Sequence, residues 1–162
     1  MEKTSIVAGV IFSVIVLFFL NYAYSYTKSL ENCSCVSFLK SNITNIKNIE
    51  LFLIAIQIIG IFMNIGIYIS NIDVRNIAIT NPKIMGSFLT IYLFVLITIL
   101  INFIYNVYVF GTQMPTNCDC ANKWQKDILY IQAAIYSFTT ISTVFLLFFG
   151  FYIGFIARKK NK

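Results

Sequence analysis

Four cysteines are the residues of this chain best suited to covalent chemistry. They form two Cys-x-Cys pairs, Cys33 with Cys35 and Cys118 with Cys120. Each pair lies in a polar segment between two long apolar segments. An even number of cysteines in such segments is typical of disulfides that form in an oxidising compartment.

The spacing of the cysteines favours bonds between the two pairs. Cα atoms two residues apart on an extended chain are separated by about 7 Å, which is near the upper limit for a disulfide. A bond from Cys33 or Cys35 to Cys118 or Cys120 closes a loop of about 85 residues and stabilises the fold by roughly 4–5 kcal/mol in the chain-entropy picture. We therefore expect structural bridges between the pairs. Redox-active bonds within each pair, free thiols and a four-thiolate zinc site are the alternatives.

Residue types that most other catalysis requires are missing from the sequence. The chain contains no His, which removes the usual general base, the commonest metal ligand and the Cys–His nucleophile pair. The long apolar segments carry no Asp, Glu, Lys or Arg, although pumps and transporters normally place such a group inside the helix bundle. We therefore expect no enzymatic activity, no catalytic residue, no metal and no cofactor.

Composition indicates which elements position the cysteines. Of the 162 residues, 59% are apolar and 11% are charged, whereas soluble domains carry about a quarter charged residues. Four windows, 4–27, 51–72, 84–116 and 128–157, contain no acidic or basic residue. Each holds the ~20 apolar residues that cross a bilayer as a helix. This composition excludes a soluble enzyme, a nucleic-acid-binding domain and a disordered chain.

The predicted fold class is all-α, an integral membrane four-helix bundle built from two repeated helical hairpins. The repeat is found by aligning the chain with itself at an offset of 85 residues. Residues 18–35 and 103–120 then share six identities, including both cysteine pairs. Two hairpins of equal orientation would be related by an axis along the membrane normal. The predicted bounds are 1–83 for the first hairpin (spans about 5–26 and 51–72, Cys loop 27–50) and 84–162 for the second (spans about 84–110 and 128–157, Cys loop 111–127).

Basic residues predict the orientation, because Lys and Arg near span ends stay in the cytosol. The side with both termini and the central turn carries seven of them, against five on the side of the Cys loops. We therefore expect cytosolic termini and lumenal Cys loops. The end of the chain, Lys159-Lys160-Asn161-Lys162, resembles the dilysine retrieval signal and predicts an endoplasmic-reticulum-derived membrane. Trp124 is expected at the membrane interface. The basic tail, which could bind anionic headgroups or a partner, consists of Arg158, Lys159, Lys160 and Lys162.

Small and polar side chains recur along one face of three predicted spans. Helices in lipid gain no hydrophobic benefit from meeting, so such residues supply the contacts. A conduction path along these stripes is the alternative to packing. The expected helix-packing residues are Gln57, Gly60 and Asn64 in the second span, Thr98, Asn102 and Asn106 in the third, and Gln132, Thr139, Thr143, Gly150 and Gly154 in the fourth.

The second Cys loop resembles small multi-span membrane proteins of large cytoplasmic DNA viruses. The resemblance rests on the motif Asn117-Cys118-Asp119-Cys120-Ala121-x-x-Trp124 and on Asp127 before the last span. It implies a component of the virion inner membrane or a minor capsid protein. It also implies that the four cysteines and Trp124 order the loops, without a catalytic role.

The function expected from these observations is structural, namely anchoring a membrane to a partner protein layer. Its partners would be the lipid bilayer and capsid or other membrane proteins, with no nucleic acid. One alternative is a thiol–disulfide oxidoreductase similar to the DsbB and vitamin K epoxide reductase-like families, which also have four spans and paired loop cysteines. A second alternative is a passive pore formed by a homo-oligomer.

Overall fold

The computed structural model describes the backbone of residues 3–70 and 82–160, and side chains within 6–70, 86–87 and 89–149. These residues form long helices and no strand, so the described fold is all-α. The helices are α1 (Lys3–Leu30), the short 3-10 helix η1 (Ser34–Leu39), α2 (Lys40–Ser70), α4 (Pro82–Gln113) and α5 (Gln125–Lys160).

The helix ends follow from local sequence. Pro82 occupies the first position of α4, where its missing N–H costs nothing because the first amides of a helix have no partner. Pro115 is the second residue after the end of α4 and cannot continue a helix. Asp127 lies in the first turn of α5 and Lys28 in the last turn of α1, and each charge has the sign that the helix dipole favours there.

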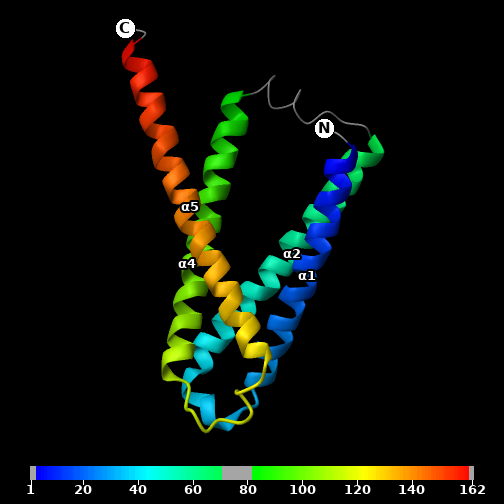
Figure 1. Cartoon of the computed structure of the whole chain (residues 1–162), viewed down its shortest axis with the longest axis vertical. Coiled ribbons are helices and arrows are strands. Elements are labelled where there is room, and N and C mark those ends of the chain that lie inside the picture. Colours follow the sequence, from blue (N-terminus) through cyan, green and yellow to red (C-terminus); the bar gives the residue numbers. More distant parts are fainter. Residues whose placement is uncertain (1–2, 71–81, 161–162) are drawn as a thin grey trace.

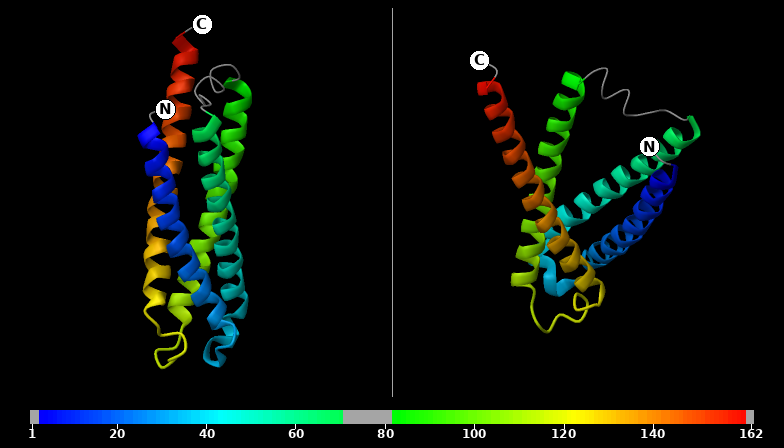
Figure 2. Two further views of the ribbon diagram at one scale, coloured as in Figure 1. Left: turned by 90° about the vertical axis from the view of Figure 1, so that its right-hand side faces the viewer. Right: turned by 45° about the horizontal axis from the view of Figure 1, so that its top comes forward.

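The helices form two hairpins that meet at one end of the molecule and diverge toward the other. In Figure 1, both Cys-bearing loops lie at the closed end, whereas the start of α1 and the end of α5 lie at the open end. The second view in Figure 2 shows the same divergence between the α1–α2 and α4–α5 pairs. The most extensive contacts between the long helices follow the cyclic order α1, α2, α4, α5.

The core is confined to the closed end. Apart from Ile6, every buried side chain among the described residues lies within 20–53 or 100–140. The outward sides of the helices are apolar and highly exposed, with Phe12, Phe62 and Phe94 among the most exposed rings. Four described segments are long and apolar enough to cross a membrane: Ile6–Leu30, Ser34–Ser70, Leu89–Gln113 and Gln125–Phe149. Such a surface is compatible with a multi-pass membrane protein.

The prediction of a Cys loop over residues 27–50 is wrong for most of these residues, which are helical. α1 continues to Leu30, η1 follows after three residues, and α2 begins at Lys40. The helical part is amphipathic, since Ile43, Ile46 and Leu53 recur at helical spacing and are buried. A search for uncharged runs finds only the part of a helix that can face lipid. It therefore misses residues 40–50, where the same helix continues with one apolar and one polar face. The second loop is shortened less, to 114–124.

The two halves of the repeat have different surroundings despite their matched residues. Phe18 is 59% exposed, whereas its counterpart Phe103 is completely buried. Thr27 is buried, whereas its counterpart Thr112 is exposed. One reason is that α1 and α2 remain in contact over more of their length than α4 and α5 do.

Candidate functional site

The four cysteines come together at the closed end, where the two loops meet. One disulfide joins Cys33 to Cys120 and the other joins Cys35 to Cys118, with Cα–Cα distances of 6.0 and 5.9 Å. Both bonds therefore connect the first loop to the second, and neither closes within a Cys-x-Cys pair. The pairing is nested, because the 83-residue separation of one bond lies inside the 87-residue separation of the other.

The two disulfides are close neighbours, so the four sulfur atoms form one cluster, the sulfur tetrad. All four Sγ atoms lie within 4.8 Å of one another. Between the two bonds, the Sγ–Sγ distances are 3.2 Å for Cys35 and Cys120 and 3.8 Å for Cys33 and Cys118. Cys33 and Cys118 are buried, whereas Cys120 is exposed. A thiol from solution would therefore reach the tetrad at Cys120.

Backbone turns hold each pair of cysteines in place. The Val36 amide donates to the Cys33 carbonyl at 3.3 Å, and the Ala121 amide donates to the Cys118 carbonyl at 3.0 Å. The side chains of Val36 and Ala121 are both completely buried. The Tyr26 hydroxyl of α1 donates to the Ala121 carbonyl at 2.5 Å. The second loop is thus tied to the first hairpin by a hydrogen bond and by burial as well as by sulfur.

Trp124 also connects the second loop to the first hairpin. Its ring lies 5.7 Å from the ring of Tyr22 on α1, measured between centroids. The Trp124 side chain remains mostly exposed. Such an amphipathic ring at the edge of the apolar region is typical of the membrane interface.

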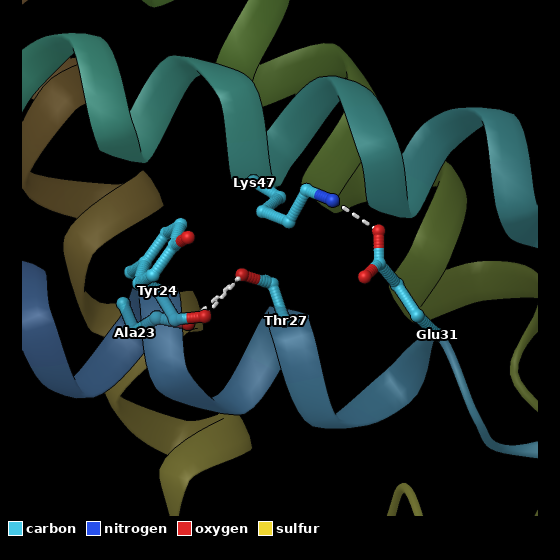
Figure 3. Close-up of polar contacts among 5 residues, drawn as sticks. All are labelled: Ala23, Tyr24, Thr27, Glu31 and Lys47. Carbon is cyan, nitrogen blue, oxygen red and sulfur yellow. Dashed lines mark hydrogen bonds and ion pairs between the residues drawn. The ribbon is translucent and has the colours of Figure 1, made fainter.

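Polar side chains near the loop end form contacts within α1 and between α2 and the residue that follows α1 (Figure 3). The buried Thr27 hydroxyl donates to the carbonyls of Ala23 and Tyr24 in its own helix, at 3.1 and 3.0 Å. Its polar atom is therefore satisfied without a partner on α2. Lys47 of α2 forms an ion pair with Glu31, just beyond the end of α1. Ion pairs of this partly exposed kind contribute about 0–1 kcal/mol.

An asparagine cluster joins α2 to α4. Asn42 and Asn45 of α2 donate to the Asn106 side-chain oxygen at 3.0 and 3.4 Å. The Asn106 amide then donates to the Asn102 carbonyl at 2.8 Å. Asn106 was among the expected packing residues, whereas Asn42 and Asn45 were missed because they fell inside the expected loop. Their three-residue spacing was the signal available in the sequence.

Glu50 is an ionisable group inside the bundle, although it lies just outside the uncharged window 51–72. Placed by sequence at the end of the first loop, it is instead a completely buried residue of α2. Its neighbour on α5 is Gln132, whose Nε2 atom donates to the Tyr136 hydroxyl at 3.0 Å. Neither carboxyl oxygen of Glu50 accepts a hydrogen bond of normal geometry, and the Gln132 oxygen also has none. A neutral Glu50 acid could donate to that oxygen, whereas a buried unpaired carboxylate is very unfavourable.

The other expected packing residues are less buried than Asn106 and Gln132. Gln57, Gly60, Asn64 and Thr143 are partly buried, whereas Thr98, Asn102 and Thr139 are exposed. The hydroxyls of Thr98, Thr139 and Thr143 donate to carbonyls of their own helices. A packing role for these residues stays a prediction. The helix that carries Gly150, Gly154, Arg158, Lys159 and Lys160 is described without its side chains there, and Lys162 lies outside the described residues.

The arrangement as a whole can hold two hairpins together and can take part in thiol–disulfide chemistry. As two disulfides the sulfur tetrad offers no thiolate nucleophile, so its direct effect is to fasten the loops. No family model, curated protein or solved structure matches this chain. Its function has to be inferred from its own residues.

Proposed function

We propose that this chain is a structural multi-pass membrane protein that anchors a membrane to a partner protein layer. The observation that carries the proposal is the nested pair of disulfides between the two loops. These bonds fasten two apolar hairpins into one unit at the end where the core lies. A unit fastened in this way suits an anchor, because its two hairpins cannot separate at the loop end.

The apolar outer surface supports placement in lipid. Large apolar side chains are exposed on all four long helices, including Phe12, Phe62, Phe94 and Phe138. Soluble monomers rarely expose contiguous apolar patches beyond a few hundred Å². In a bilayer the same surface faces hydrocarbon at no such penalty, and the helical backbone satisfies its own hydrogen bonds.

The proposed orientation places the sulfur tetrad in an oxidising lumen and the basic tail in the cytosol. The disulfide chemistry and the excess of positive charge on the tail side both support this orientation. The tail would then contact an acidic partner protein or anionic headgroups. The resemblance of the second loop to virion membrane proteins supports a virion inner membrane or minor capsid role.

Crosslinking in native membranes tests the anchor. A variant with Arg158, Lys159 and Lys160 changed to Ser removes three of the four positive charges of the tail. Its matched control changes Lys123 and Lys126 to Ser at the opposite end. We expect both variants to stay in the carbonate-resistant membrane fraction and only the tail variant to lose the crosslinked partner. Retention of the partner by the tail variant, or release of wild-type protein by carbonate, would overturn the proposal.

A thiol–disulfide oxidoreductase is the second candidate, because the two disulfides lie within 4.8 Å and Cys120 is exposed. A substrate thiolate would attack Cys120 and release Cys33 as a thiolate. The second substrate thiol would then displace Cys120, leaving an oxidised substrate and two reduced cysteines. Their two electrons and two protons would pass to a quinone. Quinone reduction by purified protein and a dithiol, lost on Cys120→Ser, would favour this candidate, whereas no turnover would exclude it.

A further inference from the structure

The sulfur tetrad has the shape of a metal site as well as of two disulfides. Four cysteines from two loops direct all their Sγ atoms into a region in which no two atoms are more than 4.8 Å apart. Two disulfides far from each other would fasten the loops equally well. The Cys-x-Cys spacing instead places the two bonds side by side, so that all four sulfur atoms are within reach of a single ion.

Of the four Sγ–Sγ distances between the two bonds, two match the edges of a tetrahedral zinc site and two are shorter by about 0.4–0.6 Å. With Zn–S bonds of about 2.3 Å, the edges of a ZnS₄ tetrahedron are about 3.8 Å long. Four of the six Sγ–Sγ edges of the tetrad measure 3.2, 3.4, 3.7 and 3.8 Å. The remaining two edges are the disulfides, which reduction opens. Side-chain rotation then suffices to reach a tetrahedron, since the bonded residues have Cα atoms about 6 Å apart.

The supports of the tetrad do not depend on the disulfides. The backbone turns at Cys33 and Cys118, the buried Val36 and Ala121 side chains, and the Tyr26 hydrogen bond are contacts that reduction leaves intact. These contacts keep the two loops adjacent after reduction. The four thiols therefore stay close enough to bind one ion, which limits the loss of chain entropy on binding.

The chemistry of the donors specifies the class of metal. Four thiolates form a soft, all-sulfur ligand set, which selects Zn²⁺ or a similar thiophilic ion over Mg²⁺ or Ca²⁺. We propose that the reduced sulfur tetrad, Cys33, Cys35, Cys118 and Cys120, binds one Zn²⁺ ion. The two loops are then fastened by disulfides in an oxidising compartment and by metal in a reducing one. This proposal does not rest on the anchor function.

The conversion balances with an added reductant. Each disulfide takes up two electrons from a phosphine, which becomes a phosphine oxide, and two protons from the water that supplies its oxygen, so the tetrad yields four thiols. Binding of Zn²⁺ then displaces the four thiol protons and leaves a tetrathiolate complex of charge −2. Protons are released, so binding weakens as the pH falls.

Metal titration of the full chain in detergent micelles tests the proposal. After anaerobic reduction by a phosphine and removal of excess metal, we expect one Zn²⁺ per chain. With Co²⁺ as the probe, we expect thiolate-to-cobalt charge-transfer absorption. Asp119→Asn retains all four sulfurs and is expected to bind like wild type, whereas Cys35→Ser is expected to lose stoichiometric binding. Oxidised protein is expected to bind none.

A second measurement keeps the test independent of variant folding. In reduced wild-type protein, Zn²⁺ is expected to slow alkylation of all four thiols together, as counted by intact mass. Protection of fewer than four thiols, unchanged metal content in Cys35→Ser, or no retained metal would each overturn the proposal. Any of these results leaves crosslinking of the tail unaffected, so failure here is distinct from failure of the anchor.

Discussion

Removing the disulfides one at a time should give strongly non-additive losses of stability. The two bonds close loops of 87 and 83 residues. In the chain-entropy picture, a loop of either length is worth about 4.6 kcal/mol when it is the first to close. Once one bond has formed, the second closes only a small ring containing residues 33–35 and 118–120. For about six residues the same relation gives about 2 kcal/mol.

The perturbations are Cys35→Ser with Cys118→Ser, Cys33→Ser with Cys120→Ser, and all four changes together. We expect each double variant to lose about 2 kcal/mol of unfolding free energy, because the other bond still closes the long loop. The quadruple variant is expected to lose about 7 kcal/mol, well above the sum of the two doubles.

The assay is titration with SDS in mixed micelles, followed by the fluorescence of Trp124. This residue is the single tryptophan of the chain and contacts Tyr22 across the loop–helix junction, so its emission reports on separation of the hairpins. The reasoning is refuted if the losses are additive, with about 4 kcal/mol for each double variant and about 8 kcal/mol for the quadruple variant. It is equally refuted if the quadruple variant is as stable as wild type.

Substitutions at three further residues, Tyr26, Asn106 and Glu50, test contacts at the closed end by the same titration. Tyr26→Phe removes one buried hydrogen bond and should lower the unfolding free energy by about 1–2 kcal/mol. Its control, Tyr105→Phe at an exposed ring, should change the unfolding free energy by less than about 0.5 kcal/mol. Equal losses in the two variants would contradict the role of Tyr26. Asn106→Leu removes the acceptor shared by two α2 side chains and should cost about 2 kcal/mol, so a more stable variant would show that this cluster does not hold α2 to α4. Glu50→Gln should remain within about 1 kcal/mol of wild type, because it keeps a neutral donor for the side-chain oxygen of Gln132. Glu50→Ala should lose about 2–3 kcal/mol, because it leaves the Gln132 oxygen unpaired and creates a cavity. A greater loss in Glu50→Gln than in Glu50→Ala would show that Glu50 is held as a charged group.

Much of the architecture was predictable because it depends on local sequence. Uncharged runs in α1, α2, α4 and α5 are long enough to form apolar helices, and such helices satisfy their own backbone. Pro82 and Pro115 mark the ends of α4 for reasons that involve the backbone alone. The location of the cysteines between helices followed from the same segmentation.

The start of α2 was not predictable from the length of its uncharged run. The residues from Lys40 to Glu50 are helical because one of their faces packs against other helices. Lys40, Lys47 and the buried Glu50 interrupt the uncharged length, so a search for uncharged runs does not find this part of the helix. The burial of Glu50 was missed for the same reason. A hydrophobic period of 3.6 residues in Ile43, Ile46 and Leu53 was the usable signal.

The sequence by itself determined the helical class, the length of the apolar segments and the gathering of the cysteines in two loops, because these depend on residue type and short spacing. The tertiary structure alone decided that Cys33 bonds to Cys120 and Cys35 to Cys118. The alternative bonds between the pairs close loops of nearly equal length, so chain entropy does not distinguish them and only the approach of the two loops does. The same holds for Phe18 and Phe103, which occupy matched positions in the repeat but differ in burial, because the environment of a side chain depends on the neighbouring helices.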